Sequence, residues 1–447
     1  MTDSASTPLP VLPTAESKEK TTAGNYFVAN YPPFSFWTTE ATETVHRLLD
    51  RPAPDTPLGL YTHIPFCRKR CDFCYFKVYT DKNAKEIKRY LDAVIAEMAQ
   101  YASRPYIKGR RLKFIYFGGG TPSYLSVEQL QYLFGGLQSH LSWAGAEEIA
   151  FECEPGTLQE KKIRALREMG VTRLSLGVEN FDPQILELNN RAHRAREIFR
   201  AYEVAREVGF PQVNIDLIAG MVGETEENWK RCIEETIRLA PESVTIYQLE
   251  VPFNTTIYRR MKDGGTEVAP VADWETKRRW VSEAFARLEQ AGYSIGSAYT
   301  AVKDRHVKFL YRDALWTGAD MLGIGVSSFS HLAGVHFQNE HNFDPYLVMI
   351  ESGRLPIHRA MALTDEERLI REFILQMKLG RVGTSYFRDK FDVDVTNRFA
   401  EPLRKHEQAG LLNVRNGVIE LTRRGLLQVD RLLHDFFLDR HRHARYA

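Results

Sequence analysis

The sequence is poor in cysteine, carries almost no net charge and lacks long apolar runs. Five of its 447 residues are cysteine, and the charged side chains balance to a formal charge of +1. A small, odd number of cysteines argues against a disulfide framework and fits a reducing compartment. The charge balance gives no reason to expect nucleic acid or an anionic membrane as a partner. No stretch of eighteen apolar residues is present, so we expect no membrane span.

The N-terminus also lacks the apolar core of a secretory signal. Its first 24 residues are rich in Ser, Thr and Pro, which favours a disordered leader and a cytoplasmic protein. We predict an N-terminal extension over residues 1–57 that is partly disordered. Its segment 25–37 is unusually aromatic and fits either a lid over an active site or a strip packed on the body of the protein.

Short apolar runs alternate with longer amphipathic runs between residues 58 and 300. This succession predicts strands and intervening helices, with strands over 58–65, 112–120, 147–155, 173–180, 213–221 and 243–251 and helices over 85–102, 127–141, 160–170, 195–210 and 225–240. Such units require a parallel sheet with right-handed crossovers. Six of them predict an α/β fold with a partial, TIM-like (β/α)6 barrel, whose reactive groups gather at the C-terminal ends of the strands.

After about residue 300 the strand–helix rhythm is lost, which predicts a separate C-terminal domain over residues 301–447. From about residue 360 the pattern is helical and winged-helix-like. Thr364 and Glu367 form a capping-box start, and Asn416 and Gly417 mark a hairpin before a last helix over 424–438. Winged helices often bind DNA, but the basic residues here alternate with acidic ones and form no stripe. We therefore expect no nucleic-acid partner.

Uncommon residues gather at the ends of the predicted strands. In chain order they are Cys67, Cys71 and Cys74, then Gly118, Gly119 and Gly120, then Glu152 and Glu154, then Glu179, and last Asp216. Each has a structural explanation alone, because glycines turn the chain and strand-end carboxylates are commonly solvated. Their coincidence at one rim predicts a functional site.

The spacing of the three cysteines limits what the thiols can hold. Zinc sites normally present four nitrogen or sulfur ligands, and a cysteine triad on one loop is not a usual zinc arrangement. Closely spaced thiolates on one loop are typical of iron–sulfur clusters, and three of them leave one iron of a four-iron cluster without a protein ligand. A thiol-exchange pair of Cys71 and Cys74 is an alternative that leaves Cys67 unexplained. Inert burial fits poorly, because charged residues separate the cysteines.

The pattern C-x-x-x-C-x-x-C, with Phe73 before the last cysteine and GGGTP after the next strand, resembles the radical S-adenosylmethionine (SAM) superfamily. More narrowly, the chain resembles the oxygen-independent coproporphyrinogen III oxidase family and its relatives from about residue 58 to its C-terminus. The motifs that carry this resemblance are YTHIPFC, YFGGGTPSYL, FECEP, RLSLGVENF, NIDLIAGM and LGIGVSSFS. The resemblance implies a radical SAM core barrel over residues 58–300 that the C-terminal domain covers.

The resemblance also implies cofactors and the residues that hold them. Cys67, Cys71 and Cys74 would bind a [4Fe–4S] cluster whose open iron chelates SAM. The other positions that match contacts to this SAM are Phe73 at the adenine, Gly118 and Gly119 at the methionine amino group, Tyr61, Glu152, and Phe329 closing over it.

Members of the family place a second SAM beside the first. The matching positions are Gly120, Thr121, Glu179, Arg191, Asp216 and Leu249 or its neighbour. A guanidinium binds a carboxylate through two parallel hydrogen bonds, which suits Arg191 to the methionine carboxylate. Among all these residues we assign Tyr61, Glu152 and Glu179 to the catalytic group.

The resemblance implies a radical SAM oxidoreductase that cleaves SAM reductively and uses the 5′-deoxyadenosyl radical on a buried organic substrate. Within the family, the expected reaction is oxidative decarboxylation of a coproporphyrinogen III-type tetrapyrrole in haem biosynthesis, with a flavodoxin or ferredoxin as electron donor and a monomeric chain. Two departures keep alternatives open: Phe76 stands where those enzymes usually carry a further cysteine, and Glu179 where they commonly show an amide. The alternatives are a C-methyltransferase, including haem-degrading ones, a cyclopropane-forming enzyme, and a haem-chaperone-like protein.

Overall fold

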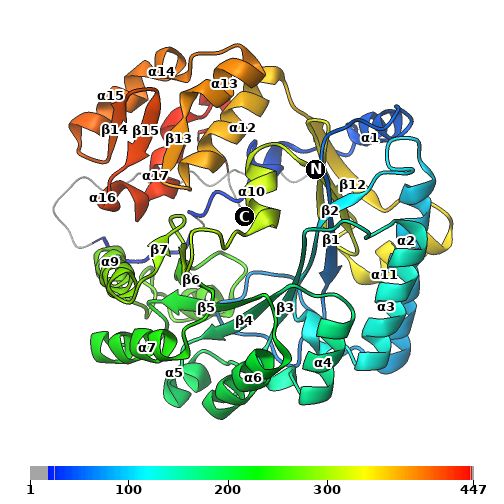
Figure 1. Cartoon of the computed structure of the whole chain (residues 1–447), viewed down its shortest axis with the longest axis horizontal. Helices are drawn as coiled ribbons and strands as arrows, with labels where there is room; N and C mark the ends of the chain where they lie inside the picture. The colour runs from blue at the N-terminus through cyan, green and yellow to red at the C-terminus, as the bar shows by residue number, and fades with distance from the viewer. Residues whose placement is uncertain (1–18, 25, 443, 445–447) are drawn as a thin grey trace.

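The computed structural model describes residues 19–24, 26–442 and 444 (Figure 1). Residues 1–18 of the predicted disordered leader lie outside the described residues. Residues 19–24 contact the folded protein, since Thr21 donates a hydrogen bond from Oγ1 to the carbonyl oxygen of Ala272 over 2.7 Å.

The centre of the molecule is a parallel sheet whose first six strands follow one another in space as they do in the chain. These strands are β1 (Leu58–Ile64), β2 (Leu112–Gly119), β3 (Glu148–Cys153), β4 (Arg173–Glu179), β5 (Gln212–Ala219) and β6 (Ser243–Gln248). They are buried on both faces, which is why they read as near-continuous apolar runs. The predicted partial (β/α)6 barrel is confirmed.

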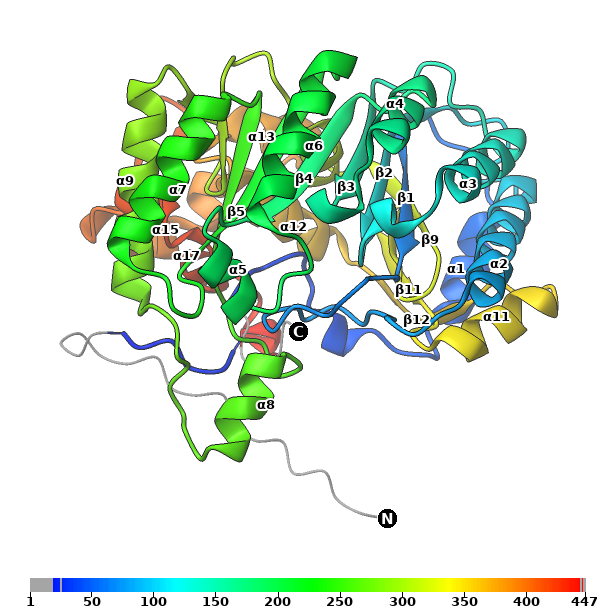
Figure 2. The ribbon, with the colours of Figure 1, turned by 90° about the horizontal axis from the view of Figure 1, so that it is seen from below.

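Amphipathic helices cover the outer face of these strands, as Figure 2 shows. They are α2 (Ala84–Ser103), α3 (Val127–His140), α4 (Glu160–Glu168), α6 (Ala195–Val208), α7 (Glu226–Leu239) and α9 (Trp274–Gln290). Capping boxes begin α2 at Asn83 and α3 at Ser126, so local sequence sets these helix starts. The shorter helices are α1 (Thr42–Leu49), α5 (Pro183–Leu188), α8 (Thr256–Asp263), α10 (Leu310–Trp316) and α11 (Phe343–Glu351).

The sheet continues beyond both edges of the barrel strands. β8 (Thr300–Val302) and β7 (Ser294–Ile295) follow β6, while β9 (Asp320–Ile324) pairs in parallel with β1. Antiparallel β10 (Phe329–Leu332), β11 (Val335–Asn339) and β12 (Ile357–Ala362) complete a 12-stranded sheet. The predicted boundary at residue 300 therefore falls inside this sheet, and the predicted domain limits stay predictions.

The C-terminal part is helical and carries a small antiparallel sheet in the order β13 (Arg381–Gly383), β15 (Val418–Leu421) and β14 (Leu412–Arg415). Its helices are α12 (Asp365–Met377), α13 (Thr384–Phe391), α14 (Val395–Arg398), α15 (Ala400–Gln408), α16 (Arg423–Leu426) and α17 (Val429–Leu433). The capping box of Thr364 and Glu367 is present as predicted, and so is the turn at Asn416 and Gly417, two residues with positive φ. The predicted helix over 424–438 is wrong, because Gln428 leaves helical geometry (φ −132°, ψ 25°) and separates α16 from α17.

The aromatic segment near the N-terminus packs along the C-terminal part. Tyr31 is buried, and its hydroxyl lies 2.7 Å from Nδ1 of His441. Trp37 stacks on His336 with ring centroids 5.0 Å apart. These contacts hold two distant parts of the chain together, while a role as a lid stays a prediction. No helix among the described residues is long and apolar enough to cross a membrane.

Candidate active site

The three cysteines of the motif lie on the loop between β1 and α2, at the C-terminal end of the sheet. Cys67, Cys71 and Cys74 are all free thiols. Within the described part of the chain, their sulfur atoms do not form a group in which all lie within 4.8 Å of one another. Three thiols on one loop are typical ligands of an iron–sulfur cluster.

The charged residues between the cysteines anchor this loop to its neighbours. The Arg68 guanidinium binds the Glu154 carboxylate, with Nε to Oε2 at 3.1 Å and Nη2 to Oε2 at 2.9 Å. Nδ1 of His193 lies 3.3 Å from the other oxygen of Glu154. Asp72 is paired with Arg260. These ion pairs fix the loop, so its high charge is compatible with a rigid, partly buried position.

The sulfur atoms themselves have polar neighbours from other elements. Arg191, which follows α5, donates a hydrogen bond from Nη1 to Cys71 Sγ over 3.2 Å. Thr121 Oγ1 lies 3.3 Å from Cys67 Sγ. Burial raises the pKa of Cys67 to about 12 and that of Cys74 to about 11. These thiols therefore need a bound cationic centre to become thiolates at neutral pH.

Three glycines at the end of β2 leave room beside the thiols. A Cβ on Gly120 would stand 3.0 Å from Cys67 Sγ and 2.9 Å from the backbone carbon of Pro65. Gly119 has φ +116°, and a Cβ there would meet the His63 ring at 2.6 Å. A Cβ on Gly118 would come within 3.1 Å of the Glu152 carboxyl group. A residue with a Cβ at any of these three positions would clash with its neighbours. The glycines therefore keep the space beside the Cys67 sulfur free of side-chain atoms.

Glu152 at the end of β3 is held by two donors. The Tyr116 hydroxyl donates to Oε1 over 2.5 Å, and the Gly119 N–H donates to Oε2 over 3.0 Å. Burial raises the pKa of Glu152 to about 7, and the charges of Asp216 and Glu179 push it in the same direction. The carboxyl group is thus fixed in place while its proton remains exchangeable near neutral pH.

Glu179, Arg191 and Asp216 lie on the side of the site next to β4 and β5. Glu179 ends β4 with φ 64°, an uncommon backbone geometry for a residue other than glycine, and burial raises its pKa to about 7. Arg191 lies 3.5 Å from Glu179 and donates to the Gly177 carbonyl oxygen over 2.6 Å. Asp216 accepts hydrogen bonds from Ser175 and Asn214, both at 2.8 Å, and burial raises its pKa.

Sequence reasoning missed an aromatic wall beside Glu152. Tyr116 stacks on Tyr311 of α10 with ring centroids 4.4 Å apart and on Tyr61 at 6.0 Å. The Tyr61 hydroxyl lies 3.0 Å from Nδ1 of His63. Tyr116 precedes the buried Phe117 in β2, and neighbouring residues of a strand point to opposite faces, so its position on the inner face could have been inferred from the sequence. Tyr311 has no such sequence signal, because it reaches the site from a distant helix.

The remaining predicted residues lie in two places. Phe73 packs against a small apolar cluster that contains Leu249. Phe329 begins β10, is 37% exposed, and contacts Phe34 and Trp37 with ring centroids 6.0 and 5.6 Å apart. The structure thus joins Phe73 to Leu249 and places Phe329 against the N-terminal segment.

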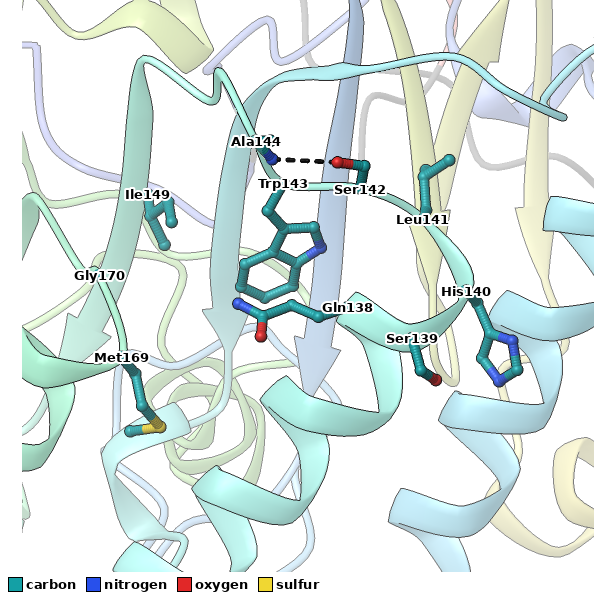
Figure 3. Close-up of a pocket in the computed structure, with 10 residues that line it drawn as sticks. All are labelled: Gln138, Ser139, His140, Leu141, Ser142, Trp143, Ala144, Ile149, Met169 and Gly170. Carbon is teal, nitrogen blue, oxygen red and sulfur yellow. Dashed lines mark hydrogen bonds between the residues drawn. The ribbon is translucent and has the colours of Figure 1, made fainter.

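A pocket of about 590 Å³ lies at the other end of the sheet, as Figure 3 shows. Its lining includes Gln138 in the last turn of α3, Trp143 after that helix, Ile149 near the start of β3, and Gly170 just before β4. These positions are at the N-terminal ends of the strands, opposite the thiols. The pocket is therefore not part of the candidate active site.

Two family profiles match this chain. The Radical SAM superfamily profile matches residues 61–236, and the HemN C-terminal domain profile matches residues 363–427. The chain therefore contains a radical SAM domain over residues 61–236 and a HemN C-terminal domain over residues 363–427.

Relatives of this radical SAM protein cover most of its length. It is 29% identical over 392 residues to an oxygen-independent coproporphyrinogen III oxidase of Escherichia coli (strain K12), a match that covers 84% of each chain. It is 28% identical over 372 residues to the heme chaperone HemW of Bacillus subtilis (strain 168), covering 82% of this chain and 96% of that one. The solved coproporphyrinogen III oxidase HemN of Escherichia coli superposes with a TM-score of 0.80 at 26% identity, covering 93% of this chain and 99% of the other.

The radical SAM domain over residues 61–236 implies a [4Fe–4S] cluster and SAM. The residues present fit these groups. Three free thiols share one loop, Arg191 already donates to one sulfur, and the Gly120 position leaves the space beside another without a side chain. The Nε atom of Arg191 and the Nε2 atom of His63 are buried at this site with no hydrogen-bond partner. Both atoms are therefore available for a hydrogen bond with a bound group.

Proposed function

We propose that this radical SAM protein is an oxidoreductase that acts on a buried tetrapyrrole, by oxidative decarboxylation of the coproporphyrinogen III type in porphyrin biosynthesis. The observation that carries the proposal is the convergence of three free thiols, an arginine donor and the three partly buried carboxyl groups of Glu152, Glu179 and Asp216 at one end of the sheet. The matched length of relatives named coproporphyrinogen III oxidase supports the substrate class.

When bound, the [4Fe–4S] cluster and SAM supply reductive cleavage of SAM and the 5′-deoxyadenosyl radical that removes a hydrogen atom from the substrate. In this proposal Cys67, Cys71 and Cys74 hold the cluster, and Arg191 stabilises the negative charge that a thiolate at Cys71 carries. Gly118 and Gly119 admit the methionine end of SAM, and Phe73 lies against its adenine.

Glu152 and Tyr61 serve as positioning and proton-holding groups beside this SAM. The two donors to Glu152 fix its carboxyl oxygens, so it can accept a hydrogen bond without a change of rotamer. Its raised pKa lets it hold or release a proton near pH 7. Phe329 closes over the same SAM from β10.

We place a second SAM at Gly120, Thr121, Glu179, Arg191, Asp216 and Leu249. Glu179 and Asp216 can accept hydrogen bonds from ribose hydroxyls or from an amino group. In the present geometry the two Nη atoms of Arg191 contact Cys71, Gly177 and Glu179. Only its Nε atom has no hydrogen-bond partner and is available to a carboxylate. A second SAM at this place would therefore compete with Glu179 for the arginine.

Methyl transfer is the second candidate, and Glu179 and Phe76 leave room for it because both depart from the residues that coproporphyrinogen oxidases usually carry. A partly buried Glu179 that can carry charge beside the second cofactor changes the electrostatics of that site. Phe76 presents an exposed ring on the cysteine loop where coproporphyrinogen oxidases usually carry a cysteine. A haem-chaperone function is the third candidate, since the relative named HemW is matched over 96% of its length.

We further propose a monomer that works in the cytoplasm, receives single electrons from a flavodoxin or ferredoxin, and binds no nucleic acid. The interleaved charges of the C-terminal part support the last point. An affinity for DNA that falls steeply with salt would contradict it.

The deciding experiment is an anaerobic product analysis. The reconstituted protein is mixed with dithionite, SAM and coproporphyrinogen III, and nucleosides and tetrapyrroles are identified by mass spectrometry. Appearance of 5′-deoxyadenosine with loss of carbon dioxide supports decarboxylation. S-adenosylhomocysteine with a gain of one methyl group in mass supports methyl transfer. Stoichiometric haem binding without turnover supports the chaperone function.

A further inference from the structure

A second cluster of ligand-type side chains lies outside the cysteine site. Among the residues that the structure describes, Glu340, His341 and His358 bring one carboxylate oxygen and two ring nitrogens within 4.8 Å of one another. Glu340 and His341 follow β11 directly, and His358 is the second residue of β12. None of the three takes part in the proposed reaction.

Both imidazoles face the same carboxylate through the same ring atom. Nδ1 of His341 lies 3.3 Å from Oε1 of Glu340, and Nδ1 of His358 lies 3.5 Å from Oε2. Two ligand atoms at about 2.0–2.1 Å from a tetrahedral zinc ion stand about 3.3–3.4 Å apart. The separations of 3.3 and 3.5 Å match this spacing and also that of ordinary ion pairs, so the geometry needs little change to admit one small divalent ion.

The carboxylate is held in place by groups behind it. Oε1 of Glu340 accepts from the backbone N–H of Asn342 over 2.8 Å and from the Asn342 side-chain amide over 3.0 Å. Its side chain is only 13% exposed, whereas those of His341 and His358 are 47% and 37% exposed. Hydrogen bonds of this kind orient metal-binding carboxylates. The exposed side of the two rings leaves room for water as a further ligand.

The cluster of Glu340, His341 and His358 lies at the same end of the strands as the cysteine loop. β9 runs parallel to β1, and the antiparallel pairing of β10, β11 and β12 brings Asn339 and Ile357 to the end where β1 stops. Lys77, three residues after Cys74, donates from Nζ to Asn342 Oδ1 over 2.5 Å. The Phe343 N–H donates to the Tyr79 hydroxyl over 3.1 Å. Two hydrogen bonds thus tie the segment of the cluster to the segment that follows the cysteines.

We propose that Glu340, His341 and His358 form a binding site for one divalent transition-metal ion of the zinc type, separate from the three cysteines. Two imidazoles with one carboxylate are a ligand set for zinc and similar ions, while magnesium and calcium prefer oxygen ligands alone. The ion holds the ends of β11 and β12 together and, through Asn342 and Lys77, stiffens the segment after Cys74. The nearby cations Lys77 and Arg359 oppose the ion, so we expect weaker binding than in closed four-ligand zinc sites.

The test uses the full chain with its cluster reconstituted under anaerobic conditions, so that the cysteines are occupied. The protein is dialysed against increasing zinc chloride, and zinc and iron per chain are measured by mass spectrometry. We expect about one zinc per chain with unchanged iron, and at least about tenfold weaker zinc binding in His341→Ala and in His358→Ala. The exposed surface histidine variant His140→Ala is the matched control and should bind zinc as the wild type does.

A thermal readout separates loss of the site from loss of the fold. Zinc should raise the unfolding temperature of the wild type and of His140→Ala but not that of His358→Ala, while all three retain their iron. The proposal is overturned by equal zinc binding in the wild type and the His341→Ala, His358→Ala double variant. Zinc uptake matched by iron loss would also overturn it, because the metal would then be at the cysteines and the three residues would form only ion pairs.

Discussion

Arg191 Nη1 donates a hydrogen bond to Cys71 Sγ across 3.2 Å, although the two residues are 120 positions apart in the chain. A hydrogen bond and a positive charge at a cluster thiolate stabilise the more reduced, more negative state. We therefore expect Arg191→Met to keep the iron content, because all three thiols remain, and to lower the midpoint potential of the cluster. An anaerobic redox titration followed by electron paramagnetic resonance measures the change.

Two further variants isolate the contact at Cys71. Arg191→Lys keeps the charge without the planar fork, so its potential should lie between those of the wild type and Arg191→Met. The exposed Arg194→Met removes an equal charge nearby and should leave the potential unchanged. Equal shifts for Arg191→Met and Arg194→Met would show that general charge, not the contact with sulfur, sets the potential.

The cysteines themselves divide into ligands and core residues. Cys153 and Cys232 are buried in the main hydrophobic cluster, far from the motif in sequence. Serine at Cys67, Cys71 or Cys74 should lower iron from about four per chain to near zero after reconstitution. Serine at Cys153 or Cys232 should leave iron binding largely intact. Iron and sulfide analysis of the five variants tests the assignment, and the opposite pattern would refute it.

Gly120 offers a steric test of the space beside Cys67. An added methyl group would stand 3.0 Å from Cys67 Sγ and 2.9 Å from the backbone of Pro65, so either the sulfur or the loop must move. We expect Gly120→Ala to lower cluster occupancy severalfold. In contrast, a Cβ on Gly135 in α3 meets nothing within 4 Å, and Gly135→Ala should preserve iron and stabilise the fold by up to about 1 kcal/mol.

The strand–helix units could be predicted because their signals are local. Strands buried on both faces read as apolar runs, and the caps at Asn83, Ser126 and Thr364 mark helix starts within a few residues. The pairing of β9 with β1 could not be predicted, since nothing in the sequence of residues 320–324 specifies which strand they pair with, and β1 lies some 260 positions earlier. The break at Gln428 was also hidden, because the apolar spacing continues across it.

The candidate site divides in the same way. The cysteines, glycines and carboxylates stand out in the sequence because their types and spacing are unusual at strand ends. Their neighbours do not: Arg191 was expected to bind a carboxylate of a cofactor, and its contact with Cys71 depends on where the loop after α5 folds back. The Tyr116 hydroxyl bond to Glu152 likewise depends on the register of β2 and β3.

A buried ion pair supports the added strand β9 next to the barrel. Asp320 accepts from Arg110 Nη1 and from the Tyr106 hydroxyl, both at 2.8 Å, and its side chain is 2% exposed. Breaking a buried pair leaves an uncompensated charge, so Asp320→Ala should cost about 3–5 kcal/mol of unfolding free energy. The exposed pair of Glu160 and Arg164 is the control, and Glu160→Ala should cost no more than about 1 kcal/mol. Denaturant unfolding compares the two, and equal costs would contradict the proposed support.

Glu152 gives a pH dependence whose sign follows from its raised pKa of about 7 against an ordinary 4.5. Between these two values the folded protein holds a proton that the unfolded chain has released, so stability falls as pH rises from about 5 to 8. Glu152→Gln cannot ionise, and its unfolding free energy should therefore fall less over this range, by an amount of the order of 1 kcal/mol or more. Urea unfolding at several pH values, without added SAM, measures the difference. The exposed Glu203→Gln should follow the wild type. A Glu152→Gln profile parallel to that of the wild type would mean that Glu152 is ionised throughout, and a proton-holding role for it near neutral pH would be wrong.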